Sequence, residues 1–185
     1  DFGRGLVALA TARGWETPEG ARWVKAAEAL AKGMDAQLAD PGSGAWSDAT
    51  TLRSDTGFFA QRRSSLDGVA RAVRFRLRLR PTADERQVCL RALRAVADTR
   101  AVEEHGFHGA GALRAARSLS NLARGPLLHA AVRSDAPERA ALLRELRLVA
   151  LRDPRVRIDP PSTGGPVVTL CTDTTCLEVD DLAAL

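Results

Sequence analysis

The sequence predicts a mainly helical chain that ends in a small α/β region. Two observations favour the helices: apolar residues recur at steps of three and four along several stretches, and residues typical of helix caps precede two of those stretches. A third observation favours the strands, because short apolar or alternating runs occur after residue 125. We therefore expect about six helices followed by two or three short strands.

Residues 1–124 read as helical hairpins. We expect one helix from Asp1 to Arg13 and a second that begins after Thr17, an N-cap residue followed by Pro18. The second helix continues to about Leu38, with an apolar stripe formed by Trp23, Ala27, Leu30, Met34 and Leu38. A turn follows at residues 40–44, and residues 47–66 read as a long polar connection interrupted by Phe58 and Phe59.

The next segment is rich in arginine and ambiguous. Over residues 73–80 apolar side chains alternate with arginines, which is the period of a strand. The same residues also fit a helix in which the arginine stems cover apolar surface. Taken alone, the alternation narrowly favours a strand. Thr82 and Glu85 then form a capping box that predicts a helix to about Ala97, and another helix is expected from about Gly111 to Leu122.

Residues 125–185 read as a small α/β region that packs on the helical part, so that the whole chain forms one structural unit. We expect a strand at residues 127–132, a helix that ends near residue 152, and a weak strand at residues 155–158. A proline- and glycine-containing loop then leads to a last strand at residues 167–171. A further helix is expected to start near Asp180.

Composition bounds the function classes only loosely. The chain has 185 residues, a formal net charge of +4 and 45% hydrophobic residues, and no apolar run approaches the roughly 20 residues of a membrane span. A nucleic-acid-binding module is one alternative, through Arg74, Arg76, Arg78 and Arg80. We rank it last, because aromatic partners for base stacking are lacking there. We expect no membrane partner.

Two cysteines near the end of the sequence form the clearest candidate for chemistry. Four residues separate Cys171 from Cys176, whereas a redox site usually separates its cysteines by two. A disulfide is still possible if the loop folds back and brings the α-carbons within about 7 Å. A zinc site would need two further ligands, and nothing in the sequence ties His105, His108 or His129 to the cysteines.

We therefore interpret Cys171 and Cys176 as a redox or structural pair that flanks one tight turn. The pair should be close enough for a disulfide under oxidation but reduced in the cell, since an odd number of cysteines favours a reducing compartment such as the cytoplasm. Acidic neighbours raise a thiol pKa, so neither thiol should be a strong nucleophile. Cys89 is expected in a helical core. We expect no metal and no cofactor.

The same segment carries a family resemblance. Its strand, its two cysteines separated by a polar stretch and the following Asp180-Asp181-Leu182 resemble the C-terminus of the thioredoxin-domain-containing family similar to spermatogenesis-associated protein 20. Earlier matches are looser. They comprise Asp1-Phe2 at the start of a helix, Gly44-Ala45-Trp46 in a hairpin, and Asp67-Gly68 at the start of the next helix.

The resemblance implies the last helical hairpins of an (α/α)6 toroid, like that of six-hairpin glycosidases and sugar epimerases. It implies a helix for the arginine-rich segment, and we adopt the helix over the local strand reading. It also implies that the chain belongs to a longer protein, whose thioredoxin domain and first toroid half would be its partners. A candidate pocket would hold Trp46, Asp40 and Asp67.

The sequence also departs from the family. Where the family has Pro-Ser-Gly-Asn after its Asp-Gly pair, this chain has Val69-Ala70-Arg71-Ala72. This change favours a region that is degenerate or non-catalytic by itself. The alternative is the active part of a carbohydrate-processing, sugar-active or redox-linked enzyme that takes a small carbohydrate. Trp15, Trp23 and Trp46 could stack on a sugar, but core packing is the favoured interpretation for them.

Overall fold

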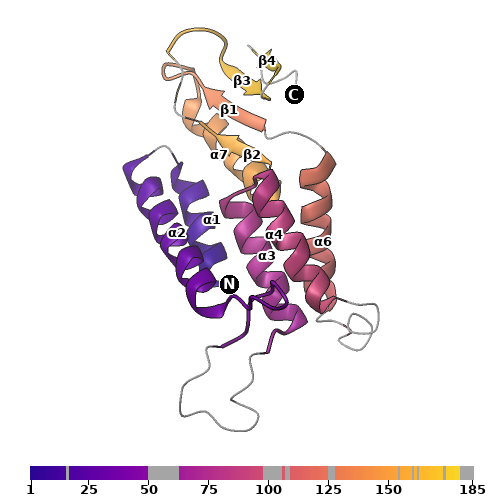
Figure 1. Cartoon of the computed structure of the whole chain (residues 1–185). Coiled ribbons are helices and arrows are strands. Elements are labelled where there is room, and N and C mark those ends of the chain that lie inside the picture. The colour runs from indigo at the N-terminus through magenta and orange to yellow at the C-terminus, as the bar shows by residue number, and fades with distance from the viewer. Residues whose placement is uncertain are drawn as a thin grey trace. The chain divides into compact units, whose positions relative to one another are not determined.

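The computed structural model describes residues 1–15, 17–49, 63–97, 106, 109–124, 128–153, 155–159, 161, 163–172 and 174–179. Within these ranges there are six helices and a four-stranded mixed sheet, which lies near the end of the chain and has the last helix between its first two strands in sequence (Figure 1). The prediction of a mainly helical chain with strands near its end is thereby confirmed. The chain divides into two compact units, the first made of Asp1–Arg4 with Ala27–Ala123 and the second of Gly5–Ala26 with Arg124–Leu185.

The helices lie close to the predicted ranges. They are α1 (Phe2–Arg13), α2 (Pro18–Leu38), α3 (Leu66–Leu79), α4 (Ala83–Val96), α6 (Gly109–Arg124) and α7 (Arg139–Arg152). Both predicted caps are confirmed: the Thr17 hydroxyl accepts from the backbone of Gly20 at 3.0 Å, and the Thr82 hydroxyl accepts from the backbone of Glu85 at 3.2 Å. Ser65 caps α3 in the same way. A hydroxyl at these positions satisfies an amide that the first turn leaves without an intrahelical partner.

The arginine-rich segment is helix α3, so the local strand reading is wrong and the helix adopted from the resemblance is confirmed. Leu66, Val69, Val73 and Leu77 lie at helical spacing and are all buried. Because successive helical residues are rotated by about 100°, Arg74 and Arg78 lie on one face and Arg76 lies on another. The alternation that suggested a strand therefore does not correspond to two faces of a sheet.

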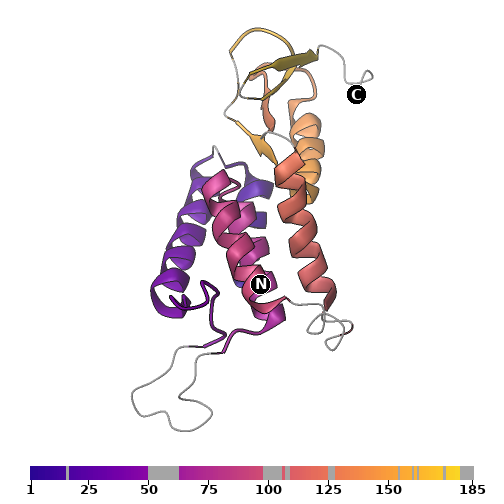
Figure 2. The same cartoon turned by 45° about the vertical axis from the view of Figure 1, so that its right-hand side comes forward.

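The core of the first unit forms where α3, α4 and α6 run side by side (Figure 2). Helices α3 and α4 make a hairpin with a three-residue connection. The buried core includes a tryptophan from the hairpin after α2 and small or branched residues from all three helices: Trp46, Leu66, Val69, Val73, Leu77, Cys89, Leu93, Ala112, Ala115 and Leu119. Cys89 is buried in this core, as predicted.

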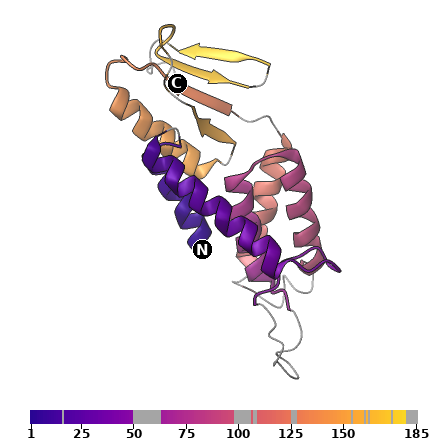
Figure 3. The same cartoon turned by 60° about the vertical axis from the view of Figure 1, so that its left-hand side comes forward.

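The second unit contains the sheet and α7. Its strands are β1 (Leu128–Val132), β2 (Val156–Ile158), β3 (Val168–Cys171) and β4 (Cys176–Val179), in the order β2-β1-β3-β4. Strands β1 and β2 are parallel and are joined through α7, which packs against both (Figure 3). The pairs β1–β3 and β3–β4 are antiparallel. Val132, Ile158 and Val168 pack with Leu142 and Leu143 of α7.

Strand β4 is the element that the sequence did not predict. Its four residues alternate too briefly to indicate a strand, and the strand depends on pairing with β3 across a tight turn. The helix expected from Asp180 lies outside the described residues, as do Phe58, Phe59, His105 and His108.

Candidate functional site

The cysteine pair closes the β3–β4 hairpin. Cys171 and Cys176 are directly opposite each other in the ladder and form a disulfide, with their α-carbons 4.0 Å apart. The turn between them is held by threonines: the Thr172 amide donates to the Thr175 carbonyl at 2.7 Å, and the Thr172 hydroxyl accepts from the amide of Thr175 at 3.1 Å. The predicted tight turn and proximity are confirmed. The reduced state in the cell and the weak nucleophilicity stay predictions.

His129 lies beside this pair, although the sequence analysis found nothing that ties it to the cysteines. His129 on β1 is the register partner of Cys171 and of Arg157, so the four strands carry one row of polar and sulfur side chains on a single sheet face. The His129 Nδ1 lies 3.1 Å from Asp159 Oδ1. Strand pairing brings these residues together, and no spacing along the sequence indicates it. Among the residues that the structure describes, no group of three or more histidine, cysteine, aspartate or glutamate side chains is arranged so that it could hold a metal ion.

The ring of Trp46 is buried in the first unit. Its side chain is 4% exposed, the Arg76 guanidinium lies 5.4 Å from the ring centre, and its Nε1 donates to Asp35 Oδ1 at 3.0 Å. Arg76 in turn donates to Glu85 Oε1 at 2.5 Å and to Asp35 Oδ1 at 2.5 Å. Trp46 therefore belongs to a buried polar network in which its ring is covered by a cation.

Burial and hydrogen bonding have opposite effects on the pKa of Arg76 in this network. Burial alone would lower the pKa of Arg76, but its hydrogen bonds to Glu85 and Asp35 raise that pKa well above its ordinary value. Burial, and then the neighbouring Glu85 carboxylate, raise the pKa of the Cys89 thiol. Arg76 is thus held as a cation and Cys89 as a neutral thiol, both inside the core of the first unit.

The other two residues of the candidate pocket, Asp40 in the same hairpin as Trp46 and Asp67 in α3, have partners of their own. Asp40 closes the turn after α2: its carboxylate accepts from the Gly42 amide at 3.1 Å and from the Ser43 hydroxyl at 2.6 Å. Gly44 in the same turn has a φ of +73°, which favours glycine. Asp67, in the first turn of α3, forms an ion pair with Arg71 at 2.7 Å. Neither of the two cavities described below is lined by all three of Trp46, Asp40 and Asp67, and a pocket formed by them stays a prediction.

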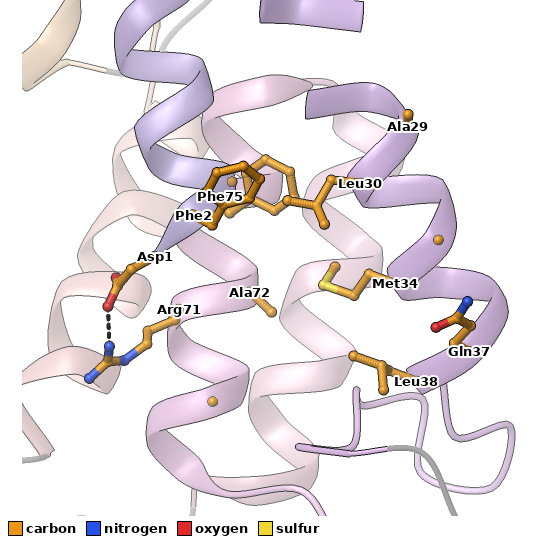
Figure 4. A pocket seen from close by; sticks show the side chains of 13 residues that line it. Asp1, Phe2, Ala29, Leu30, Met34, Gln37, Leu38, Arg71, Ala72 and Phe75 are labelled. Atoms are coloured by element: carbon orange, nitrogen blue, oxygen red, sulfur yellow. Dashed lines mark hydrogen bonds and ion pairs between the residues drawn. The ribbon is translucent and has the colours of Figure 1, made fainter. Parts of the chain in front are cut away.

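One cavity in the first unit lies between α2 and α3 (Figure 4). This α2–α3 cavity has a volume of about 550 Å³ and is mostly apolar. Figure 4 shows Leu30, Met34 and Leu38 of α2 on one side and Ala72 and Phe75 of α3 on the other. Its polar lining residues are Asp1, Gln37 and Arg71. Phe2 also lines it, with 74% of its surface exposed.

A second cavity of about 250 Å³ has a different lining, and we name it the arginine cavity. Its residues come from α3, from the start of α6 and from the first residues of the chain: Asp1, Arg4, Asp67, Arg71, Arg74, Ala110, Gly111 and Arg114. Burial, and then the charges of neighbouring arginines, lower the pKa of Arg74. If the arginine-rich segment is read as a helix, Arg71, Arg74 and Arg78 lie on one face. The sequence therefore indicates the part of this cluster that comes from α3. The arginines from α1 and α6 have no such signal.

The remaining candidate tryptophans also contact arginines. The guanidinium of Arg157 lies 4.0 Å from the centre of the Trp15 ring, and that of Arg22 lies 5.7 Å from the centre of the Trp23 ring. Burial lowers the pKa of Arg157 to about 10, against the opposing effect of Asp159. Like Trp46, these tryptophans therefore have a ring in contact with a cation of the protein itself.

Comparison with protein-family models, with curated proteins and with solved structures finds no match for this chain. The family resemblance thus rests on the residues of the sequence alone. Among the described helices, none combines the length and the apolar character required to cross a bilayer.

Proposed function

We propose that this chain is the C-terminal helical region of a thioredoxin-linked (α/α)6-toroid protein and that it is non-catalytic by itself. The order of its elements supports the proposal, because helical pairs precede a small α/β region as in the resembling family. The helical state of the arginine-rich segment and the hairpin between Cys171 and Cys176 are also consistent with the resemblance.

The main observation behind the non-catalytic assignment is that each candidate side chain binds other groups of the protein. The ring of Trp46 lies under Arg76 in the core, Asp40 closes a turn, and Asp67 is bound to Arg71. A catalytic carboxylate or stacking ring has to reach its substrate. Each of these side chains instead stabilises its own neighbourhood, so the proposed role is to complete and support a larger assembly.

Reading the full gene tests the family part of this proposal. A thioredoxin domain with a Cys-x-x-Cys motif, encoded upstream in the same reading frame, would support it. A complete upstream sequence without either a thioredoxin domain or further helical hairpins would contradict it.

A carbohydrate-processing role is the second candidate, and one observation favours it. The α2–α3 cavity combines two aromatic side chains, Phe2 and Phe75, with hydrogen-bonding groups of Gln37 and Arg71. Aromatic rings beside such groups are a common setting for sugar binding. The mostly apolar lining is less suitable, because a free sugar carries hydroxyl groups over most of its surface.

One experiment distinguishes the two candidates. The purified chain is incubated with a panel of aldoses and ketoses, and binding and conversion are followed by NMR. The first proposal expects neither. Saturable binding or conversion that is lost in Ala72→Phe, which fills the α2–α3 cavity, but kept in Ala95→Phe, at an exposed position of α4, would establish the carbohydrate role.

A further inference from the structure

We propose that the arginine cavity binds a small phosphate-bearing anion, such as the phosphate group of a phosphate monoester. This inference concerns a second cavity, which shares Asp1 and Arg71 with the α2–α3 cavity. It does not rest on the toroid assignment. Three segments of the first unit supply its cations: Arg4 from α1, Arg71 and Arg74 from α3, and Arg114 from α6.

The charges around the arginine cavity do not balance. Asp1 accepts hydrogen bonds from Arg4 and Arg71, and Asp67 forms an ion pair with Arg71. The carboxylates of Asp1 and Asp67 therefore neutralise the charges of Arg4 and Arg71. Among the residues that the structure describes, neither Arg74 nor Arg114 has a carboxylate partner. The side chains that line this small cavity therefore carry an excess of two positive charges.

This excess is unfavourable without a ligand. Arg74 is partly buried, and the arginines around it, including Arg4 and Arg114, add to the effect of burial in lowering its pKa. Like charges that share a site destabilise one another unless an opposite charge lies between them. A bound dianion would supply that charge, and guanidinium groups match phosphate oxygens through paired hydrogen bonds.

The size and backbone of the arginine cavity agree with a compact anion. Its volume of about 250 Å³ is below the usual range for drug-sized ligands. Ala110 and Gly111, in the first turn of α6, also line it. A phosphate monoester carries nearly two negative charges at pH 7, which equals the excess described above.

A strand of nucleic acid is a poorer fit to the same arginines. Arg76 is buried against Glu85, and Arg80 forms an ion pair with Glu28 at 3.6 Å. The three alternating arginines of α3 and Arg80, which follows the helix as its C-cap, therefore do not form one continuous basic surface along which a phosphate backbone could run.

Calorimetric titration with inorganic phosphate at low ionic strength tests the proposal. We expect saturable binding that strengthens between pH 5 and pH 7.5, as phosphate gains its second negative charge. Arg74→Gln and Arg114→Gln should each weaken binding about tenfold or more. Arg117→Gln, an exposed position on α6 outside the arginine cavity, is the matched control and should leave binding unchanged.

Circular dichroism of each variant checks that the helices are intact. Absence of saturable phosphate binding in the folded wild-type chain would overturn the proposal, and so would equal weakening in Arg117→Gln. A single-stranded oligonucleotide that binds more tightly than phosphate, and equally well to Arg74→Gln, would also overturn it. That result would establish a nucleic-acid surface instead.

Discussion

Arg76 and Trp46 are the centre of the polar network in the first unit, with the guanidinium 5.4 Å from the ring centre. Both side chains donate to the same oxygen, Oδ1 of Asp35, on α2. The network thus links α2, the hairpin after it and α3, and Glu85 adds α4. One residue of the network is marked in the sequence. Glu85 is the acidic residue of the capping box that begins at Thr82, but in the structure its carboxylate binds Arg76.

Replacing Arg76 should test how strongly this network supports the fold. Glu85 is 7% exposed, so Arg76→Met leaves a buried carboxylate without its partner. We expect the free energy of unfolding to fall by about 3–5 kcal/mol, the usual effect of breaking a buried ion pair. Urea unfolding followed by circular dichroism measures the change.

Two variants serve as controls for this prediction. Arg91→Met removes an exposed arginine of α4 and should change stability by no more than about 0.5 kcal/mol. Adding Glu85→Leu to Arg76→Met should restore part of the loss, because the unpaired charge is then gone. Equal losses in Arg76→Met and Arg91→Met would show that the network contributes little.

Most of the helices could be predicted from the sequence because their signals are local. Thr17 and Thr82 mark helix starts, and apolar residues at helical spacing mark the buried faces. Strand β4 and the neighbourhood of Cys171 could not be predicted, because pairing between strands determines them. The arginine cavity was missed for the same reason: Arg4, Arg74 and Arg114 are far apart in the sequence and meet only after the helices pack.

Gly68 should be intolerant of even a methyl group, although it lies in a helix. A Cβ there would overlap Asp48 Oδ1 and lie 2.9 Å from the Ser65 hydroxyl that caps α3. We expect Gly68→Ala to lower the free energy of unfolding by about 1–2 kcal/mol, since it disturbs the cap and overpacks the site. Gly5→Ala in α1 is the matched control, because nothing lies within 4 Å of its added methyl group. It should raise stability by up to about 1 kcal/mol through helix propensity, as judged by thermal unfolding.

The buried thiol of Cys89 should make stability fall at high pH. Its pKa in the folded chain is raised above the ordinary value of 9.0. The unfolded chain therefore loses the thiol proton at a lower pH than the folded chain does. The stabilising effect is complete below pH 9 and is lost as the pH rises through the higher folded pKa. We expect a decrease of up to about 1.4 kcal/mol per pH unit above pH 9.

The measurement compares urea unfolding of the wild type and Cys89→Ala from pH 8 to pH 10.5. Other groups that titrate in this range, such as Arg157 with its pKa of about 10, are present in both proteins, so their effect largely cancels in the comparison. The difference in stability between the two proteins should narrow as the pH rises. A constant difference would contradict the prediction. Native Cys89 should also resist alkylation and react only after unfolding.

The Cys171–Cys176 disulfide should stabilise only its own hairpin. The loop that it closes is short, and the chain-entropy relation gives about 2 kcal/mol for a loop of this length. In the double variant Cys171→Ser, Cys176→Ser, hydrogen exchange should accelerate for the amides of β3 and β4. Exchange in α3 and α4 should be unchanged, because these helices belong to the first unit.

The redox state of the pair in the cell is a separate question with its own measurement. Rapid acid quenching followed by alkylation and mass spectrometry counts the free thiols in protein taken directly from the cell. We expect Cys171 and Cys176 to be alkylated, since the odd number of cysteines favours a compartment that keeps thiols reduced. Air oxidation should then form the disulfide, because the strands hold the two residues opposite each other. A fully oxidised pair in the quenched sample would contradict the reduced state. With His129 and Arg157 in the same row of the sheet, it would direct attention to a redox role for that face.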